Sequence, residues 1–128
     1  MKFWTLTPVI ILGIFGGCKK ETAKTCVRGK VVRITCASTV IQALNDNSMG
    51  EDGWVNYIGN GTTIYDNVFK VSNKCMLSSS IKQGDTVWFT IDSSFSTVGN
   101  CSLCDLGDHP PTVAYRIKNV SGNSCLPD

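Results

Sequence analysis

Apolar residues follow two different patterns along the chain. Residues 1–17 form a nearly continuous apolar run in which Lys2 is the only ionisable side chain. From Cys26 onward, Val, Ile and Thr recur in short alternating runs separated by Gly, Asn, Asp and Ser, which is typical of strands joined by turns. No helical stripe in this part is longer than a turn or two. The sequence therefore predicts an N-terminal targeting segment followed by an all-β domain.

The alternation predicts five main strands. They are expected over residues 27–35, 38–44, 67–72, 86–92 and 112–120, with a weaker strand over 54–58. The first two are separated only by Cys36 and Ala37, which indicates either a tight hairpin or one long strand broken by a bulge. Residues 93–111 are expected to form a long loop.

Three runs carry a resemblance to a known barrel. They are residues 29–34 (GKVVRI), 39–44 (TVIQAL) and 84–89 (GDTVWF), the last opening with a Gly-Asp turn before the fourth strand. Their order resembles the RNA-binding members of the OB-fold class, which is a small five-stranded Greek-key barrel. The resemblance implies a disulfide-braced barrel of this kind over residues 26–128. A small β-sandwich is the alternative.

The N-terminal run is too short to be a membrane-spanning helix. Such a helix needs about 20 apolar residues, whereas this run stops at Gly16-Gly17. Residues 14–18 (IFGGC) resemble the lipobox of bacterial lipoproteins, with Phe15 where Leu is most often found. The resemblance implies that residues 1–17 are a lipoprotein signal peptide and that Cys18 becomes the acylated first residue of the mature chain. The alternatives are an uncleaved N-terminal anchor and an ordinary secretory signal cut nearby.

The lipobox also implies a location in the bacterial cell envelope. Acyl chains on Cys18 would anchor the protein to the bilayer, with residues 18–25 as a polar tether. The seven residues 19–25 reach at most roughly 25 Å when fully extended, so the domain is expected close to the lipid surface. Lys19 stands where an Asp would be associated with inner-membrane retention, which favours the outer membrane.

The charge is unevenly distributed, although the formal net charge is only +2. Residues 19–33 contain six basic side chains and one acid, whereas the chain from Ile34 onward has five basic side chains and nine acids. The basic start either contacts anionic lipid head groups or is a solvated tether and strand face. The near-neutral balance and 42% hydrophobic content favour a folded domain and give no reason to expect nucleic-acid binding.

Seven cysteines beside a single histidine indicate an oxidising compartment. Apart from Cys18, the chain has an even number that predicts a disulfide framework: Cys26, Cys36, Cys75, Cys101, Cys104 and Cys125. The OB-fold resemblance implies one pairing, between Cys75 and Cys125, because each follows one of two parallel neighbouring strands. The sequence leaves the other pairings open.

Cys101 and Cys104 form the chain's one Cys-x-x-Cys motif. A redox centre normally places such a pair at a helix N-terminus, and no βαβ pattern surrounds this one. A zinc site is a further alternative, with His109 and either Cys125 or Cys75 completing four ligands. A structural disulfide within the long loop is favoured. The acidic residues 46, 51, 52 and 66 are interpreted as turn formers rather than calcium ligands.

Trp88 is the strongest candidate for ligand binding. By alternation it points away from the core, on the same outer surface as Arg116 and Lys118, and Trp54 could extend this platform. The alternative is that the loop 93–111 covers Trp88. We therefore expect a non-enzymatic envelope lipoprotein that serves as a binding or structural module, without a cofactor, and that contacts the bilayer and an envelope protein or glycan. The alternative function is an exported thiol-disulfide redox protein using Cys101 and Cys104.

Overall fold

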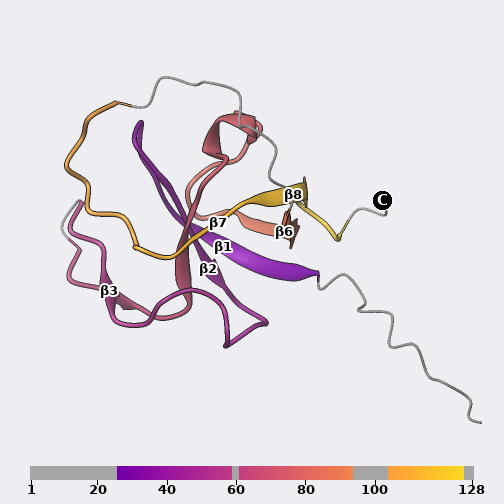
Figure 1. Cartoon of the computed structure of the whole chain (residues 1–128), viewed down its shortest axis with the longest axis horizontal. Helices are drawn as coiled ribbons and strands as arrows, with labels where there is room; N and C mark the ends of the chain where they lie inside the picture. The colour runs from indigo at the N-terminus through magenta and orange to yellow at the C-terminus, as the bar shows by residue number, and fades with distance from the viewer. Residues whose placement is uncertain (1–25, 59–60, 94–103, 126–128) are drawn as a thin grey trace, which may run out of the picture.

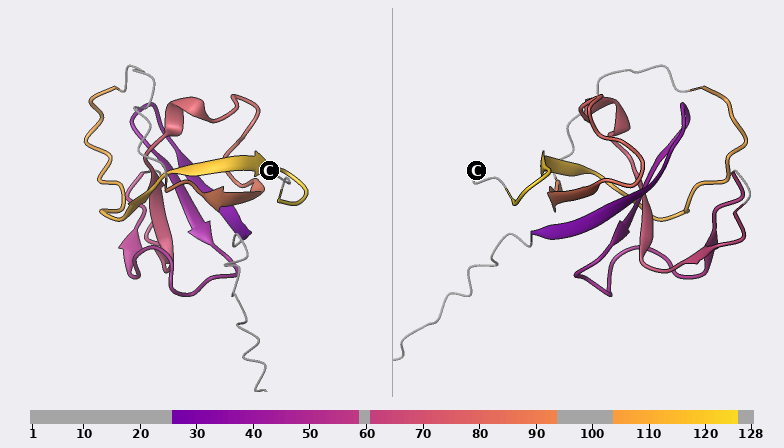
Figure 2. Two further views of the ribbon diagram at one scale, coloured as in Figure 1. Left: turned by 45° about the vertical axis from the view of Figure 1, so that its right-hand side comes forward. Right: turned by 180° about the vertical axis from the view of Figure 1, so that it is seen from behind.

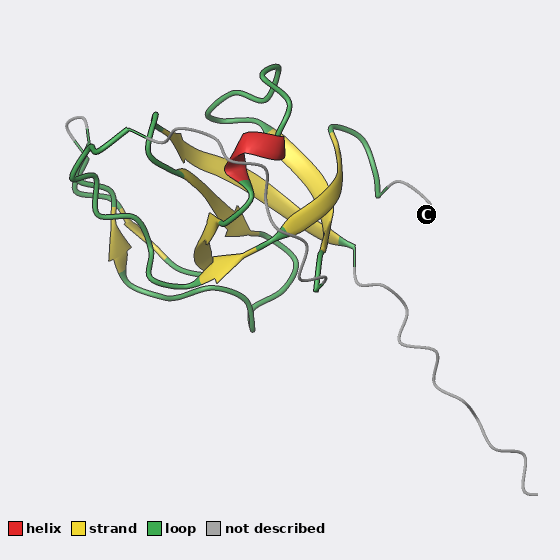
Figure 3. Ribbon diagram, turned by 45° about the horizontal axis from the view of Figure 1, so that its top comes forward, coloured by secondary structure: helices red, strands yellow, loops and turns green. Residues whose placement is uncertain are grey.

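The computed structural model describes residues 26–58, 61–93 and 104–125. The expected signal peptide and tether lie outside these residues. Within them the secondary structure is β apart from one 3-10 turn, η1 (Lys74–Met76), as the sequence predicted (Figure 3). The strands are β1 (Val27–Ile34), β2 (Thr39–Ala43), β3 (Trp54–Val55), β4 (Ile64–Tyr65), β5 (Val68–Val71), β6 (Thr86–Ile91), β7 (Ala114–Tyr115) and β8 (Ile117–Ser121).

β1 and β2 form an antiparallel hairpin at the centre of a six-stranded sheet with the order β7-β5-β2-β1-β6-β8. The backbone N–H of Thr35 donates to the Ser38 carbonyl at 2.8 Å, and Thr35 Oγ1 accepts the N–H groups of Ala37 and Ser38. The tight-hairpin alternative is therefore confirmed. A bulge is also present, but it lies inside β1, where Val32 is an extra residue between the paired Val31 and Arg33.

The C-terminal strand is divided at Arg116. β7 runs parallel to β5 at one edge of the sheet, whereas β8 runs antiparallel to β6 at the other edge. The buried Asn73 side chain holds this crossing, since its Nδ2 donates to the Ile117 carbonyl at 2.7 Å and its Oδ1 accepts the Ile117 N–H at 3.0 Å. One stretch of chain thus supplies both edges, and the sheet curls into a half-barrel (Figure 1).

This division changes the expected strand count. The sequence predicted five main strands with a single strand over residues 112–120, but that segment forms two short strands with different partners. The weak strand expected over residues 54–58 shortens to β3 and pairs with β4 in a separate two-stranded sheet. The described residues therefore form an all-β fold with eight strands, six of them in one curled sheet.

The inner face of the curled sheet carries the main core. Phe69 lies at its centre, with its ring centroid 5.8 Å from that of Phe89 and 5.0 Å from that of Tyr115. Gly29 leaves room for this packing, because a Cβ atom there would lie 2.5 Å from Ile41 Cγ2 and 2.9 Å from the Phe89 ring. The close contact explains why β1 has a glycine between two exposed basic residues.

The outer face of the same sheet is covered over only part of its area. Val32, Val40 and Val68 form a second buried cluster, and Trp54 of β3 and Tyr65 of β4 pack against it. Figure 2 shows the β3 region and the start of β1 at opposite ends of the molecule. The small β3–β4 sheet therefore covers one end of the outer face, and no other described segment covers the end near Cys26.

Disulfides connect the two ends of β1 to the C-terminal part of the chain. Cys26 bonds Cys125, with the Cα atoms 5.7 Å apart, and Cys36 bonds Cys104, with the Cα atoms 5.5 Å apart. Cys75 is also disulfide-bonded. Because the other four described cysteines pair with one another, the partner of Cys75 lies outside the described residues.

The expected bond between Cys75 and Cys125 is wrong. The reasoning assumed that the last strand stays beside β5, but after Arg116 the chain crosses to β6. Since β6 pairs with β1 through Phe89 and Val27, this path carries the C-terminal end to the start of β1. There the Cys125 sulfur lies 3.7 Å from the Phe89 carbonyl oxygen.

Candidate functional site

The structure does not bring the four residues expected to form one binding platform into a single group. Trp54 packs on the covered end of the outer face, whereas Trp88 is half-buried in the middle of β6. A register shift between Trp88 and Thr90 places Ser121 opposite Trp88 and Lys118 opposite Thr90. Lys118 is therefore a diagonal neighbour of Trp88 on the same face rather than its direct partner. Because Trp54 lies at the other end of the sheet, the four residues do not form the single platform that was predicted.

Arg116 and Lys118 lie together along a groove of about 680 Å³ between β8 and the segment after η1. The Nε of Arg116 donates to Asp92 Oδ2 at 2.8 Å, and both side chains are largely buried. An Arg116 Nη2 also lies 3.5 Å from the Met76 sulfur. The guanidinium is thus used to join the start of β8 to the end of β6.

Arg33 is the centre of a buried polar cluster at the covered end of the sheet. It is 2% exposed, and its guanidinium carbon lies 4.8 Å from the centroid of the Trp54 ring. The bulge at Val32 explains its position, because two consecutive side chains, Val32 and Arg33, face the β3–β4 sheet. Its Nη1 donates to Asn56 Oδ1 at 3.2 Å, and its Nη2 donates to Asp108 Oδ2 at 3.3 Å.

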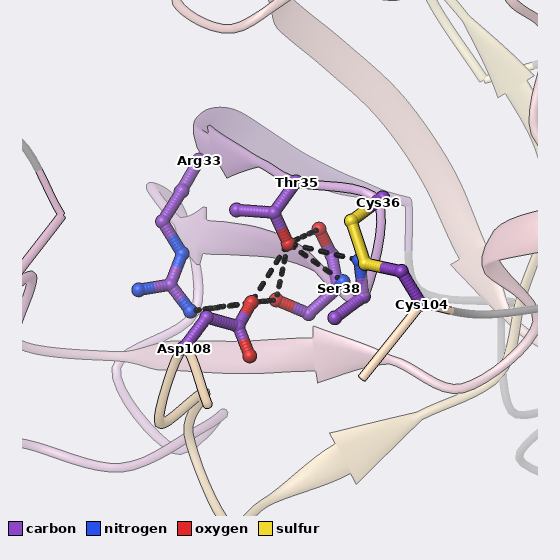
Figure 4. Close-up of a disulfide and its surroundings, with 7 residues drawn as sticks. Arg33, Thr35, Cys36, Ser38, Cys104 and Asp108 are labelled. Carbon is purple, nitrogen blue, oxygen red and sulfur yellow. Dashed lines mark hydrogen bonds and ion pairs between the residues drawn. A yellow bond between two sulfur atoms is a disulfide. The ribbon is translucent and has the colours of Figure 1, made fainter. Parts of the chain in front are cut away.

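Asp108 brings the long loop to the tip of the β1–β2 hairpin. Its Oδ2 accepts hydrogen bonds from Ser38 Oγ at 2.6 Å, Thr35 Oγ1 at 2.7 Å and the Arg33 guanidinium (Figure 4). The Cys36–Cys104 disulfide joins the same turn and loop beside this cluster (Figure 4). An ion pair, two hydroxyl donors and a covalent bond therefore fix one loop to one turn.

The ionisation of Asp108 follows from these contacts. Burial alone would raise the pKa of its carboxyl group, but the hydrogen bonds from Ser38 and Thr35 and the charge of Arg33 outweigh burial and hold the pKa below its usual value. Burial lowers the pKa of Arg33, and the neighbouring Asp108 charge opposes that effect. Both groups are charged at neutral pH, as a buried ion pair requires.

This cluster is suited to structural support rather than to catalysis. Ser38 and Asp108 are 1% and 7% exposed, so a substrate has no access to the hydroxyl group or the carboxylate. His109 follows Asp108 but contributes its backbone carbonyl, which accepts the Trp54 Nε1–H at 3.1 Å. Sequence reasoning missed the cluster because Arg33 and Asp108 are 75 residues apart and nothing local to either indicates the other.

A second cationic and aromatic group lies on the uncovered end of the outer face. Arg28 and Lys30 are exposed on β1, and Arg28 stands opposite Trp88 with its guanidinium carbon 5.8 Å from the ring centroid. Leu44, 39% exposed, lies on the other side of Arg28, since its N–H donates to the Arg28 carbonyl. We call Arg28, Lys30, Leu44 and Trp88 the β1–β6 patch. The alternation of β1 could have indicated it, because residues 28 and 30 share a face.

The disulfide pairing in the structure differs from the pairing expected from the sequence. Cys104 bonds Cys36, so the disulfide expected between Cys101 and Cys104 is wrong, and Cys101 lies outside the described residues. Cys75 and Cys125 are also disulfide-bonded, which removes the thiolates that a zinc site with His109 would need. Among the described residues no group of three or more His, Cys, Asp or Glu side chains could hold a metal ion.

Of the acidic residues around β3 and β4, Asp46 makes the local bond expected of a turn former, whereas the others bond to more distant loop residues. Asp46 Oδ1 accepts from Ser48, Asp52 Oδ1 accepts the Asn67 N–H, and Asp66 Oδ1 accepts the Gly53 N–H. Glu51 reaches further, since its Oε2 accepts from Thr112 Oγ1 at 3.1 Å. These carboxylates therefore brace loops.

The described residues define a small, disulfide-braced all-β domain in which one arginine, Arg33, is buried against a half-buried tryptophan and another, Arg28, is exposed beside a second half-buried tryptophan. No protein family, curated protein or solved structure shows significant similarity to the chain. In the part of the chain that the structure describes, no helix has the length and apolar character needed to cross a membrane.

Proposed function

We propose that the chain is a bacterial envelope lipoprotein, acylated at Cys18, whose domain is a non-enzymatic binding or structural module. The lipobox-like residues 14–18 support the anchor. The number of cysteines also supports the anchor. The five described cysteines are all disulfide-bonded, and the only others in the sequence are Cys18 and Cys101. If Cys101 is the partner of Cys75, Cys18 is the one cysteine left to carry lipid.

We also propose that the domain is an OB-like barrel. β1 pairs with both β2 and β6, and β5 has a parallel neighbour in the C-terminal segment, which is the strand arrangement that such a barrel uses. Proteins with this fold have many unrelated functions, so the fold alone does not carry the functional proposal.

A binding or structural role is favoured over catalysis by what the described surface offers. The hydroxyl and carboxylate groups of the Ser38–Asp108 cluster are buried, whereas the accessible chemistry is the cationic and aromatic β1–β6 patch. Such surfaces suit anionic or amphipathic partners. The proposed partners are the bilayer and an envelope protein or glycan, and Lys19 favours the outer membrane.

The anchor is tested by mass spectrometry of the mature protein and by membrane flotation. We expect a mature chain that begins at Cys18 and carries acyl groups. Cys18→Ser should give an unprocessed or soluble chain, whereas Thr22→Ser in the tether should leave processing and flotation unchanged. Normal processing and full membrane partition of the Cys18→Ser protein would overturn the proposal.

Peptide mapping without reduction tests the cysteine assignment. We expect three disulfides, Cys26–Cys125, Cys36–Cys104 and Cys75–Cys101, and no fast-reacting thiol in the folded protein. A readily reduced bond between Cys101 and Cys104 would contradict the assignment and favour the redox alternative.

A further inference from the structure

We propose that the β1–β6 patch lies against an anionic lipid surface, and that the domain is held on the bilayer in this orientation. The proposal rests on the membrane anchoring proposed above and adds to it the face of the domain that meets the lipid. Four observations carry it: the composition of the patch, the point at which the tether joins the domain, the reach of the tether, and the burial of Arg33, the arginine of the only other arginine–tryptophan pair among the described residues.

The composition of the patch matches an interfacial site. Arg28 and Lys30 place two cations on one face, and the cross-strand pairing sets Trp88 directly beside Arg28. Trp88 is half-buried, so the ring is fixed by the sheet while part of it remains accessible. Tryptophan is favoured at head-group level because it has an apolar body and a polar N–H, and each basic residue near an anionic surface strengthens binding.

The tether reaches the domain at this patch. β1 begins at Val27, so the first described residue, Cys26, is two positions before Arg28. The Cys26 carbonyl accepts from Asn45 Nδ2, and Asn45 Oδ1 accepts the Arg28 N–H at 2.8 Å, which fixes the entry of the chain beside the patch. Lys19, Lys20 and Lys24 of the tether add charge of the same sign.

The reach of the tether limits the orientations available. With Cys18 in the bilayer, seven residues allow at most roughly 25 Å between the lipid and Cys26. The β3–β4 end of the molecule lies on the far side from the start of β1 (Figures 1 and 2). An anchored domain therefore presents the start of β1 to the lipid more readily than it presents Trp54.

The acidic residue that follows β2 makes its hydrogen bonds within its own turn and forms no ion pair with Arg28 or Lys30. Asp46 accepts two hydrogen bonds from Ser48 and lines a separate cavity with the core residue Val27. Gln42 and Thr86, which pair with Lys30, are uncharged. The patch thus keeps its positive charge for an external partner.

Depth-dependent quenching of tryptophan fluorescence tests the proposal on the full chain. The protein is reconstituted in phosphatidylcholine vesicles with or without about 30 mol% phosphatidylglycerol, a fraction that gives the surface a negative potential. Nitroxide lipids quench near the head groups. Trp4 is lost with the proposed signal peptide, and Trp4→Phe in all variants removes it from any unprocessed chain too, so that Trp54→Phe reports on Trp88 and Trp88→Phe reports on Trp54.

We expect quenching of Trp88 to exceed that of Trp54 several-fold in the anionic vesicles. It should fall to the Trp54 level in Arg28→Glu/Lys30→Glu, and also at about 1 M salt, where the screening length is roughly 3 Å. Lys82→Glu makes the same kind of charge change at an exposed turn and should retain the signal. Equal quenching of both tryptophans, or insensitivity to the charge reversal, would overturn the proposal.

Flotation and acylation of the same samples separate this proposal from the lipid anchor. An acylated protein that floats without selective quenching of Trp88 refutes the orientation and leaves the anchor standing. Selective quenching without acylation supports the patch and refutes the anchor. The absence of both acylation and selective quenching of Trp88 refutes both proposals.

Discussion

Two arginines of β1, each beside a tryptophan of another strand, have opposite surroundings. Arg33, near the end of β1, lies against Trp54 of the small β3–β4 sheet, with 4.8 Å between the guanidinium carbon and the ring centroid. Arg28, near the start of β1, lies 5.8 Å from the Trp88 ring on a face that no other described segment covers. The residue types are identical, but of the two arginines only Arg33 has a carboxylate partner among the described residues, Asp108, and is buried with it.

The difference shows how burial decides the role of a side chain. A buried guanidinium needs a negatively charged partner, so the ion pair with Arg33 fixes the position of Asp108 and of the loop that carries it. An exposed pair of the same kind contributes little to stability and remains available to a partner. The substitutions below test this division between a stabilising and a binding pair.

The largest effect is expected for Arg33→Ala. It leaves the Asp108 carboxylate buried without its ion-pair partner, and it removes the packing on Trp54. Removing one member of a buried pair typically costs 3–5 kcal/mol, so we expect the free energy of unfolding to fall by about 4 kcal/mol. Urea denaturation measures it. Arg28→Ala is the matched control and should change stability by less than about 0.5 kcal/mol. Equal costs would contradict the division.

The second effect concerns the disulfide beside each pair. Cys36→Ser/Cys104→Ser should cost about 3 kcal/mol, and Cys26→Ser/Cys125→Ser should cost a similar amount, because both bonds close long loops. Only the loss of the Cys36–Cys104 bond should change the stability cost of Arg33→Ala, since that bond and the Arg33–Asp108 ion pair hold the same loop. A double-mutant cycle measured by denaturation should show coupling of at least about 0.5 kcal/mol for Cys36–Cys104 and none for Cys26–Cys125.

The third effect is a loss of folding stability at acidic pH. Because the folded pKa of Asp108 is lowered, its contribution to stability is complete above the usual carboxyl pKa, near about 4, and is lost as the pH falls through the lowered folded value. Unfolding midpoints measured from pH 7 downward should therefore decline in acid. Asp108→Asn should flatten this decline, whereas Asp105→Asn, at an exposed position in the same loop, should preserve it.

The smallest effects are expected for the two tryptophans. Trp54→Phe loses the hydrogen bond to the His109 carbonyl and part of the ring beneath Arg33, and should cost about 1 kcal/mol. Trp88→Phe keeps an aromatic ring on a partly open face and should stay within about 0.5 kcal/mol. Thermal unfolding of both variants side by side compares them. A larger cost for Trp88→Phe would indicate a stabilising role for that residue.

Sequence patterns predicted the central strands well because alternation reports which face of a strand is buried. β1, β2, β5 and β6 all lie within the expected ranges, and Phe69 with Val71 shares the inner face, as alternation within β5 requires. The signal was local in each case, since the residues that determine the strand are the residues that form it.

The same patterns failed where distant parts of the chain decide the outcome. Strict alternation places Arg33 on the inner face with Val27 and Val31, whereas the bulge at Val32 shifts it to the outer face, where the β3–β4 sheet covers it. The crossing at Arg116 depends on Asn73, more than 40 residues earlier, and redirects Cys125 from Cys75 to Cys26. Neither the bulge nor the crossing is indicated by the sequence near the residue whose position it determines.

The divided C-terminal strand has a consequence for association between copies of the protein. In an open sheet the two outermost strands present unpaired backbone groups that can recruit strands from other molecules. Here β7 and β8 are those outermost strands, and both belong to one continuous segment that turns at Arg116. The ends of the sheet are therefore drawn together within a single molecule, which protects this β protein against edge-to-edge aggregation.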